Sequence, residues 1–347
     1  MKSAADVVAQ ERDLLAVFDE VRHAHQMLKV KGLGHRSQGT GGSNSWRTYA
    51  LSEWSDVLVY HPADMVVTVG AGMTLSQLNR ILAEYGQWIP LSPPDGQDDT
   101  VGGAVAAGLD GIWRGGYGPF RDRVLGLRVL TPGFGAIGVG GAVVKNVAGY
   151  NLPRLFFGSH GALGVITQIT LKLSPRPQSQ WYWAWEGNLD EMVEKAHELM
   201  NWAAPWASIA FVADPHNNDI RLWAAWHGVS ETIDYLVETK EAGAAHLPLL
   251  TRPWEPGPVT LKGAIPRRLI KDLIRGWEEG QLVVEWQSGG FWGTVSEGNA
   301  GRITNWIRES SGGVSVVSGD GDLTMPFSLT PTWNRLKEAY DPHALLG

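Results

Sequence analysis

The chain has 347 residues, 44% of them hydrophobic, a formal net charge of −7 and no cysteine. This length exceeds the usual size of a single hydrophobic core, so we expect one large domain and a smaller appended one. The acidic charge and the lack of a long basic run exclude the electrostatic surface of a nucleic-acid-binding protein. The lack of cysteine excludes disulfides, thiolate zinc sites and cysteine-ligated iron–sulfur clusters within this chain.

The sequence predicts no transmembrane segment and a cytoplasmic protein. No apolar stretch approaches the roughly 18 residues that span a bilayer. The N-terminus, MKSAADVVAQERDLL, carries charges where a signal peptide has its apolar region. The 17 tryptophans, concentrated in the second half of the chain, favour packing in the core over stacking on sugars or bases.

Apolar patterns along the chain predict a mixture of helices and strands. Near-helical spacing predicts a helix over residues 7–27, and Thr74 is the expected N-cap of a second helix. Further helices are expected at 189–203 and from Thr332 to Leu346. Strands are expected at 27–32, 57–62, 65–72, 124–131 and 164–173. This order predicts an α+β fold, with a domain boundary at the Pro-rich stretch 173–178.

Glycine-rich segments are the candidate cofactor-binding parts. Three of them imitate a dinucleotide fingerprint, but each lacks its third glycine and has Ser37, Leu75 or Val143 in its place. We therefore disfavour a Rossmann fold. The turn at 32–37 can still hold a pyrophosphate, because successive backbone N–H groups form an anion nest to which Arg36 adds charge. The alternative reading of this turn is an ordinary strand connection.

Two further segments consist largely of small residues. Residues 93–103 form a loop that is followed by the string AVAAGLDG, whose apolar character indicates burial. Side chains this small permit a flat ligand to lie against the backbone, although a flexible surface loop is the alternative. The third segment, 140–150, precedes the glycines of 158–165.

These segments carry a resemblance to a known family. The strings DTVGGAVAAGLDG, GGAVVKNVAGYN and LPRLFFGSHGALGVITQITLKLSPRP have the order and spacing of the vanillyl-alcohol-oxidase-type (PCMH-type) FAD-binding family, and resemble its glycolate oxidase FAD-binding (E) subunits. The resemblance implies FAD as cofactor and a two-part FAD-binding domain over 1–178. A smaller, cap-like α+β domain over 179–330 and a C-terminal helix and tail over 331–347 would follow.

The same resemblance implies the residues that bind FAD. The turn at 32–37 would hold the pyrophosphate, and the other residues would flank the flavin, ribityl and adenine parts. The set is Gly32, Leu33, Gly34, His35, Arg36, Ser37, Pro94, Thr100, Val101, Gly102, Gly103, Ala106, Gly108, Tyr150, Gly164, Val165 and Ile166.

The sequence departs from the family pattern at several positions. His160 and Ala162 stand where related domains often have glutamate and threonine, and the tail ends without the family's final arginine. His35 is expected to contact the cofactor through its N–H or side chain, with covalent attachment to the flavin as the open alternative.

The resemblance also implies a function. The chain would be the FAD-binding subunit of a glycolate oxidase-type complex that oxidises 2-hydroxy acids. A catalytic flavoprotein subunit and an iron–sulfur subunit would be its partners, and they leave membrane association open. The catalytic subunit of such complexes carries two histidines around a Gly-Asp-Gly-Asn-Leu segment, whereas this chain has Val317 and Thr324 there.

We therefore expect no metal site, and no catalytic residue can be named from the sequence. Two alternatives stay open. The chain could be a self-sufficient FAD-dependent 2-hydroxy acid dehydrogenase, or a flavin-free interaction subunit that keeps only the fold.

Overall fold

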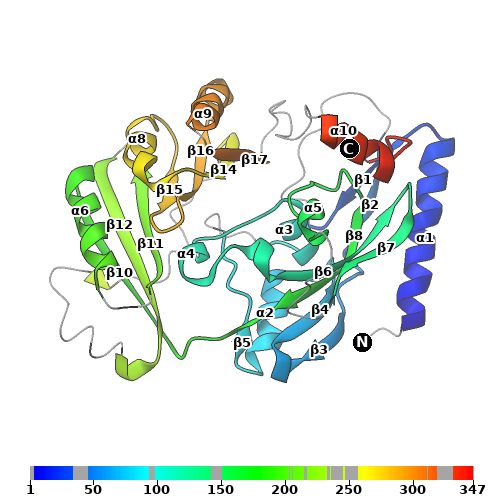
Figure 1. Ribbon diagram of the computed structural model, residues 1–347, viewed down its shortest axis with the longest axis horizontal. Coiled ribbons are helices and arrows are strands. Elements are labelled where there is room, and N and C mark those ends of the chain that lie inside the picture. The colour runs from blue at the N-terminus through cyan, green and yellow to red at the C-terminus, as the bar shows by residue number, and fades with distance from the viewer. Residues whose placement is uncertain are drawn as a thin grey trace.

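The structure is a computed structural model in which two halves lie side by side, each built around its own β-sheet (Figure 1). The N-terminal helix and the C-terminal helix both lie in the half drawn on the right. The structure describes residues 4–33, 46–93, 98–141, 151–202, 204, 206–214, 217–232, 235, 245–246, 257–310, 312–318 and 331–346.

The first half contains a five-stranded antiparallel sheet. Its strands, in spatial order, are β3 (Val57–His61), β4 (Val66–Gly70), β8 (Val165–Lys172), β6 (Val124–Thr131) and β7 (Gly135–Gly140). Two smaller sheets accompany it. One pairs β1 (Met27–Lys31) with β2 (Trp46–Ala50) in parallel, and the other pairs β5 (Gln87–Trp88) with β9 (Ser174–Pro175).

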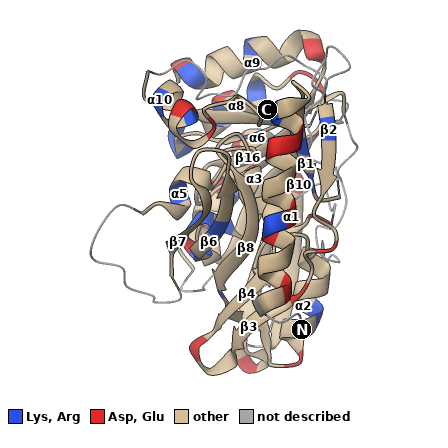
Figure 2. Cartoon of the chain, turned by 90° about the vertical axis from the view of Figure 1, so that its right-hand side faces the viewer, with Lys and Arg blue, Asp and Glu red and all other residues tan. Residues whose placement is uncertain are grey.

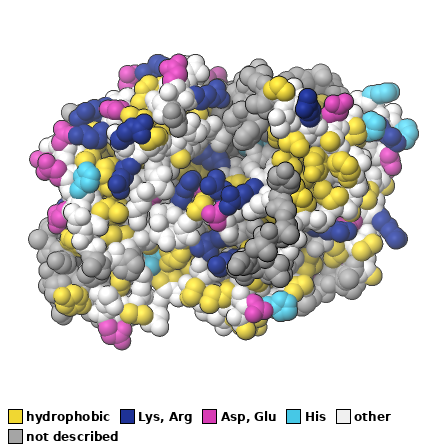
Figure 3. All heavy atoms as spheres, viewed as in Figure 1, with side chains coloured by type: hydrophobic (Ala, Val, Ile, Leu, Met, Phe, Trp, Pro, Cys, Tyr) yellow, Lys and Arg dark blue, Asp and Glu magenta, His cyan; other side chains and the backbone are white. Residues whose placement is uncertain are grey.

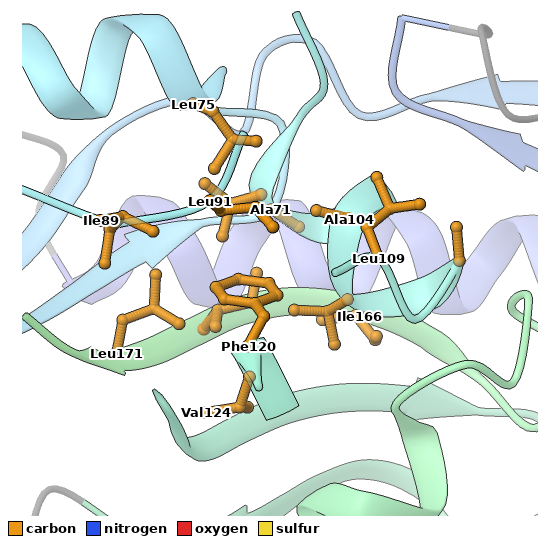
Figure 4. Packing of buried hydrophobic residues seen from close by; sticks show 14 of the residues in the cluster. Ala71, Leu75, Ile89, Leu91, Ala104, Leu109, Phe120, Val124, Ile166 and Leu171 are labelled. Atoms are coloured by element: carbon orange, nitrogen blue, oxygen red, sulfur yellow. The ribbon is translucent and has the colours of Figure 1, made fainter. Parts of the chain in front are cut away.

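Helices of very different length pack against these strands. The two longer ones are α1 (Ala4–His23) and α2 (Leu75–Ala83), and the short ones are α3 (Val101–Ala106), α4 (Arg114–Tyr117) and α5 (Pro153–Phe156), with 3-10 turns η1 (Pro62–Asp64) and η2 (Phe120–Arg123). Helix α2 begins at the capping box that Thr74 forms with Gln77. Figure 4 shows Phe120 in the core, between Leu91 and Val124 and beside Ile166 of β8.

Helix α1 is fixed to the sheet by one buried acid. Figure 2 shows α1 running beside β8. Glu11 of α1 is 4% exposed and accepts two hydrogen bonds from the Arg128 guanidinium on β6, at 2.8 and 2.7 Å. These two bonds raise the pKa of Arg128, as the side-chain hydrogen bonds to Glu11 outweigh its partial burial.

The second half contains an eight-stranded sheet. Its strands, in spatial order, are β13 (Ala245–His246), β10 (Ser179–Gly187), β12 (Asn217–Gly228), β11 (Trp206–Asp214), β15 (Leu282–Glu285), β16 (Gly290–Val295), β14 (Val259–Ala264) and β17 (Gly313–Ser318). The helices of this half are α6 (Leu189–Met200), α8 (Ile270–Arg275) and α9 (Glu297–Glu309), with the 3-10 turn η3 (Arg267–Leu269).

The tryptophans of this half are mostly buried, which confirms the expected role in packing. Seven of them are 5% exposed or less, namely Trp183, Trp206, Trp223, Trp226, Trp277, Trp286 and Trp292.

Helix α4 forms a close contact between the two halves. Gly116 makes this approach possible, because a Cβ there would lie 2.7 Å from the Cα of Ala207 in β11. At the end of α4, the Tyr117 hydroxyl lies 2.9 Å from Nδ1 of His227 in β12. Burial lowers the pKa of His227 to about 4, so its ring is neutral at pH 7.

The C-terminal segment returns to the first half. Helix α10 (Pro331–Tyr340) places the Lys337 ammonium against three acceptors, the carbonyl oxygens of Ala162 and Leu346 at 2.7 and 2.6 Å and an Asp341 carboxylate oxygen at 2.7 Å. Asp341 is 2% exposed and also accepts hydrogen bonds from the backbone N–H groups of Leu345 and Leu346, both at 2.9 Å. This cluster holds the tail against the segment that precedes β8.

The secondary structure confirms the strands predicted at 124–131 and 164–173 and the N-cap at Thr74. The α+β fold class is also confirmed, and the change from one large sheet to the other falls between β9 and β10. The predicted domain limits at 178 and 330 stay a prediction. Within the described residues, no helix combines the length and the apolar character needed to cross a membrane.

We expect Lys337→Met to lower the free energy of unfolding by about 3 kcal/mol, because it leaves the buried Asp341 carboxylate without its cation. Urea unfolding followed by tryptophan fluorescence measures this change. Lys271→Met is the matched control, since Lys271 pairs with Asp190 on the surface and its loss should cost much less. Equal losses for the two variants would contradict the role of Lys337.

Candidate functional site

Helix α3 presents a strip almost free of side chains. Val101, Ala104 and Val105 are fully buried in the core of the first half. Gly103, Ala106 and the following Gly108 are partly exposed, and we call these three residues the α3 strip. Because nothing larger than a methyl group projects from the strip, a flat ligand can lie directly against the backbone.

The N-terminal amides of α3 are already engaged within the protein. Val101 and Gly102 donate their N–H groups to the carbonyl oxygens of Met73 and Ala71, at 2.8 and 2.9 Å. Gly103 donates its N–H to the side-chain oxygen of the N-cap Thr100 at 3.0 Å. Phosphate groups therefore cannot use these three N–H groups, and would need donors from another segment.

The predicted pyrophosphate turn begins next to this end of α3. A Cβ on Gly32 would lie 2.3 Å from Oγ1 of Thr100, so the backbone of Gly32 passes directly over the Thr100 side chain. Leu33 is 48% exposed. Gly34, His35, Arg36 and Ser37 lie outside the described residues, as do Pro94 and Tyr150.

A second glycine turn packs against the other end of α3. Gly158 and His160 donate their backbone N–H groups to the carbonyl oxygens of Val105 and Ala106, at 2.9 and 2.8 Å. Gly108 has a φ of +60°, and a Cβ there would lie 2.9 Å from the Cα of Gly158. Only glycine at 108 allows this approach. The structure thus brings together the glycines at 32, 103, 108 and 158, which are far apart in the sequence.

Other predicted cofactor-binding residues lie in the core. Gly164, Val165 and Ile166 are buried at the start of β8, and a Cβ on Gly164 would lie 2.6 Å from a side-chain carbon of Val129 (Figure 4). Gly102 is buried as well, with its missing Cβ 2.6 Å from that of Ala71. The side chains of these residues support the sheet and α3. As far as the structure describes the site, the α3 strip is the part with open space for an isoalloxazine or adenine ring, and the predicted set stays a prediction.

A cavity of about 460 Å3 lies between the two halves, beside the α3 strip. Figure 3 shows Lys and Arg side chains gathered near the middle of this face of the molecule. The first half contributes residues from 107 to 121 and from 157 to 160, and the second half contributes β14, β15, β16 and β17. Its charged and titratable lining residues are Asp110, Arg114, Arg121, His160, Lys262 and Glu285.

Lys262 connects the second half to the end of α3. Its ammonium donates hydrogen bonds to the carbonyl oxygens of Ala107 and Gly108, and the residue is 8% exposed. Along β14, Val259 and Leu261 pack into the core of the second half, whereas Lys262 points to the opposite side. A cation therefore lies at the floor of the cavity, in contact with a residue of the α3 strip.

His160 lies in the same cavity as a neutral base. Burial, followed by the positive charge of Lys262, lowers the pKa of His160 to about 4. Its backbone φ of +52° is left-handed, which orients the residue at the turn that packs on α3. A neutral imidazole at pH 7 can accept a proton from a bound hydroxyl group.

Two carboxyl groups of the cavity are buried and hydrogen-bonded. Asp110 pairs with Arg114 at 2.8 Å and accepts the backbone N–H of Phe120 at 2.7 Å. Glu285 accepts the backbone N–H groups of Gln287 and Ser288 at 3.0 and 2.7 Å. Burial raises the pKa of both carboxyl groups in spite of these donors.

Sequence reasoning missed helix α3 itself and the cavity residues of the second half. Residues 93–103 were expected to be a loop, yet α3 begins at Val101, and Thr100 followed by a small apolar run carries the N-cap signal that identified Thr74. Lys262 had no comparable signal, because its contact with Ala107 and Gly108 joins distant parts of the chain.

In the part of the chain that the structure describes, no three His, Cys, Asp or Glu residues lie close enough to hold a metal ion. Val317 is part of β17, and Thr324 lies outside the described residues. The expectation of no metal site stays a prediction.

Comparison with known proteins concerns mainly the first half. The family described as FAD binding domain matches residues 3–137. The glycolate oxidase subunit GlcE of Escherichia coli is 36% identical over 173 residues, which cover 50% of this chain and 48% of GlcE. The mitochondrial D-lactate dehydrogenase (cytochrome) of Arabidopsis thaliana is 41% identical over 128 residues, 37% of this chain and 22% of that protein. The glycolate oxidase subunit GlcD of Bacillus subtilis is 31% identical over 142 residues, 41% of this chain and 30% of GlcD.

The chain thus spans about half the length of GlcE and less of the other two relatives. The fold as a whole is shared more widely. A solved structure of alkyldihydroxyacetonephosphate synthase matches 94% of this chain and 73% of its own, with a TM-score of 0.66. At 16% identity, this likeness concerns the fold alone. Residues 3–137 therefore match an FAD binding domain, as the sequence predicts.

Proposed function

We propose that the chain is the FAD-binding subunit of a glycolate oxidase-type complex that oxidises 2-hydroxy acids, and that it supports a separate catalytic subunit. The α3 strip carries this proposal, because it offers an open, nearly side-chain-free surface within the FAD binding domain. The similarity to GlcE and GlcD supports the choice of complex. When bound, FAD supplies an acceptor for two electrons.

In this proposal the residues of the chain hold the cofactor and shape its surroundings. The turn at 32–37 binds the pyrophosphate, since the first-turn amides of α3 are engaged elsewhere. The α3 strip lies along the flat ring system. The two halves, joined at α4, exclude water from the cavity side of the site.

A catalytic flavoprotein subunit and an iron–sulfur subunit are the proposed partners. The chain has no cysteine, so electrons that reach a cysteine-ligated cluster must leave it for another chain. A cytoplasmic location, with membrane association through these partners, belongs to the same proposal.

One observation favours the alternative of a self-sufficient dehydrogenase. The cavity beside the strip combines a neutral base, His160, with the half-exposed Arg121, a cation suited to a carboxylate. A 2-hydroxy acid needs these two functions, one for its hydroxyl proton and one for its carboxylate. The third alternative, a flavin-free interaction subunit, requires that the purified protein be colourless.

A leucine side chain on the α3 strip should weaken FAD binding. Among the described residues, a Cβ on Gly103 would meet only Thr100 Oγ1, at 2.9 Å, so the rest of a leucine side chain would project into the space meant for the cofactor. We expect Gly103→Leu and Ala106→Leu each to weaken FAD binding roughly tenfold to hundredfold in Kd, or by about 1.4–2.8 kcal/mol. Titration of the flavin-free protein with FAD measures the change.

Gly301→Leu in α9 is the control, because within the described part of the chain a Cβ there meets no atom within 4 Å. This variant should bind FAD like the unaltered chain. An unchanged Kd for FAD in folded Gly103→Leu and Ala106→Leu proteins would refute the assignment of the strip.

The isolated chain should not oxidise 2-hydroxy acids. Under anaerobic conditions, glycolate or D-lactate should leave its visible flavin absorption unchanged, whereas dithionite should bleach it. The complex reconstituted with its partner subunits should be bleached by the substrate. Bleaching of the isolated chain at a catalytic rate would establish the self-sufficient dehydrogenase instead. His160→Ala would then be expected to slow the reaction, since it removes the proton acceptor.

A further inference from the structure

We propose that Lys262 is a positioning residue through which the second half of the molecule raises the reduction potential of FAD bound on the α3 strip. This inference rests on the proposed function, because it requires FAD at the strip. It concerns the sheet residue itself, which lies far from the FAD-binding strings in the sequence.

Lys262 contacts the C-terminal end of α3 across the boundary between the two halves. Lys262 lies on β14, yet its ammonium donates hydrogen bonds to the carbonyl oxygens of Ala107 and Gly108 at the C-terminal end of α3. Gly108 is part of the α3 strip, and β14 belongs to the side of the second half that faces the first (Figure 1). A ring that lies along the strip would therefore lie beside Gly108, whose carbonyl oxygen accepts a hydrogen bond from this ammonium.

The charge of Lys262 lies in a buried environment. Lys262 is 8% exposed and is surrounded by the cavity walls, so solvent screens it poorly. Its field reaches across the cavity, since it contributes to lowering the pKa of His160 and opposes the rise in the pKa of Asp110. A new negative charge beside the strip would interact with the same ammonium.

Reduction changes the net charge of the cofactor. Reduction of bound FAD to its anionic reduced form would add two electrons and one proton. In the proposed complex these come by way of the catalytic partner from a 2-hydroxy acid, which loses two electrons and two protons to become a 2-oxo acid, and the second proton passes to solvent. Reduction therefore adds one negative charge to the ring system. A buried cation next to the strip stabilises the reduced form more than the oxidised form, which raises the potential.

The test compares three variants that separate charge from hydrogen bonding. Lys262→Gln keeps an N–H donor for the two carbonyl oxygens but removes the charge. Lys262→Arg keeps the charge, and Lys262→Met removes both the charge and the donors. The midpoint potential of bound FAD is measured by anaerobic titration against a reference dye, together with the Kd for oxidised FAD.

We expect Lys262→Gln to bind oxidised FAD but to favour the reduced form at least about tenfold less, which for a two-electron couple is about 30 mV lower. Lys262→Arg should stay close to the unaltered chain, and so should Lys271→Met, which removes a surface lysine far from the strip. An unchanged potential in Lys262→Gln, or an equal drop in Lys262→Arg, would overturn the proposal. If Lys262→Met does not fold, the Gln and Arg variants still decide the question.

Failure of this inference differs from failure of the proposed function. A chain that binds no FAD at all refutes the proposed function before any potential is measured. A chain that binds FAD tightly, and whose potential ignores the charge at position 262, refutes only the role of Lys262.

Discussion

The six-residue helix α3 cannot keep its shape by its own hydrogen bonds, because isolated helices shorter than about 12 residues are marginal in water. Its conformation depends on the segments that surround it. The carbonyl groups of Ala71 and Met73 take the N–H groups of its first turn, and the glycine turn at 158–160 takes the carbonyls of its last. Lys262 completes the far end from the second half. The surface proposed to bind FAD is therefore assembled from both halves of the molecule.

The C-terminal tail extends this dependence to the end of the chain. Lys337 binds the carbonyl oxygen of Ala162, which follows the glycine turn that packs on α3, and the backbone N–H of Leu28 donates to the carbonyl of Leu345 at 2.6 Å. The tail thus connects the segment before β8 with β1, which leads into the predicted pyrophosphate turn. The tail thereby joins two of the segments proposed to hold the cofactor.

The sequence predicted those elements whose signal is local. The apolar runs at 124–131 and 164–173 coincide with β6 and β8, because short runs rich in Val, Ile, Leu and Thr suit a largely buried strand. Helix α3 was missed because two glycines in six residues have poor helix propensity, and only tertiary contacts compensate for it. The order of the eight-stranded sheet and the contact of Lys262 with α3 join distant residues, so no local pattern reveals them.

The cationic residues of the cavity could stabilise either the reduced cofactor or a carboxylate substrate. A carboxylate substrate and reduced FAD are both anions, and one buried ammonium cannot stabilise both fully. Lys262 points at the carbonyl groups beside the strip, whereas Arg121, another cation of the lining, is half exposed and lies beside Asp122. A buried positive charge of the site is thus placed toward the proposed flavin position. This placement suits the proposed role of the chain as a subunit that accepts and passes on electrons.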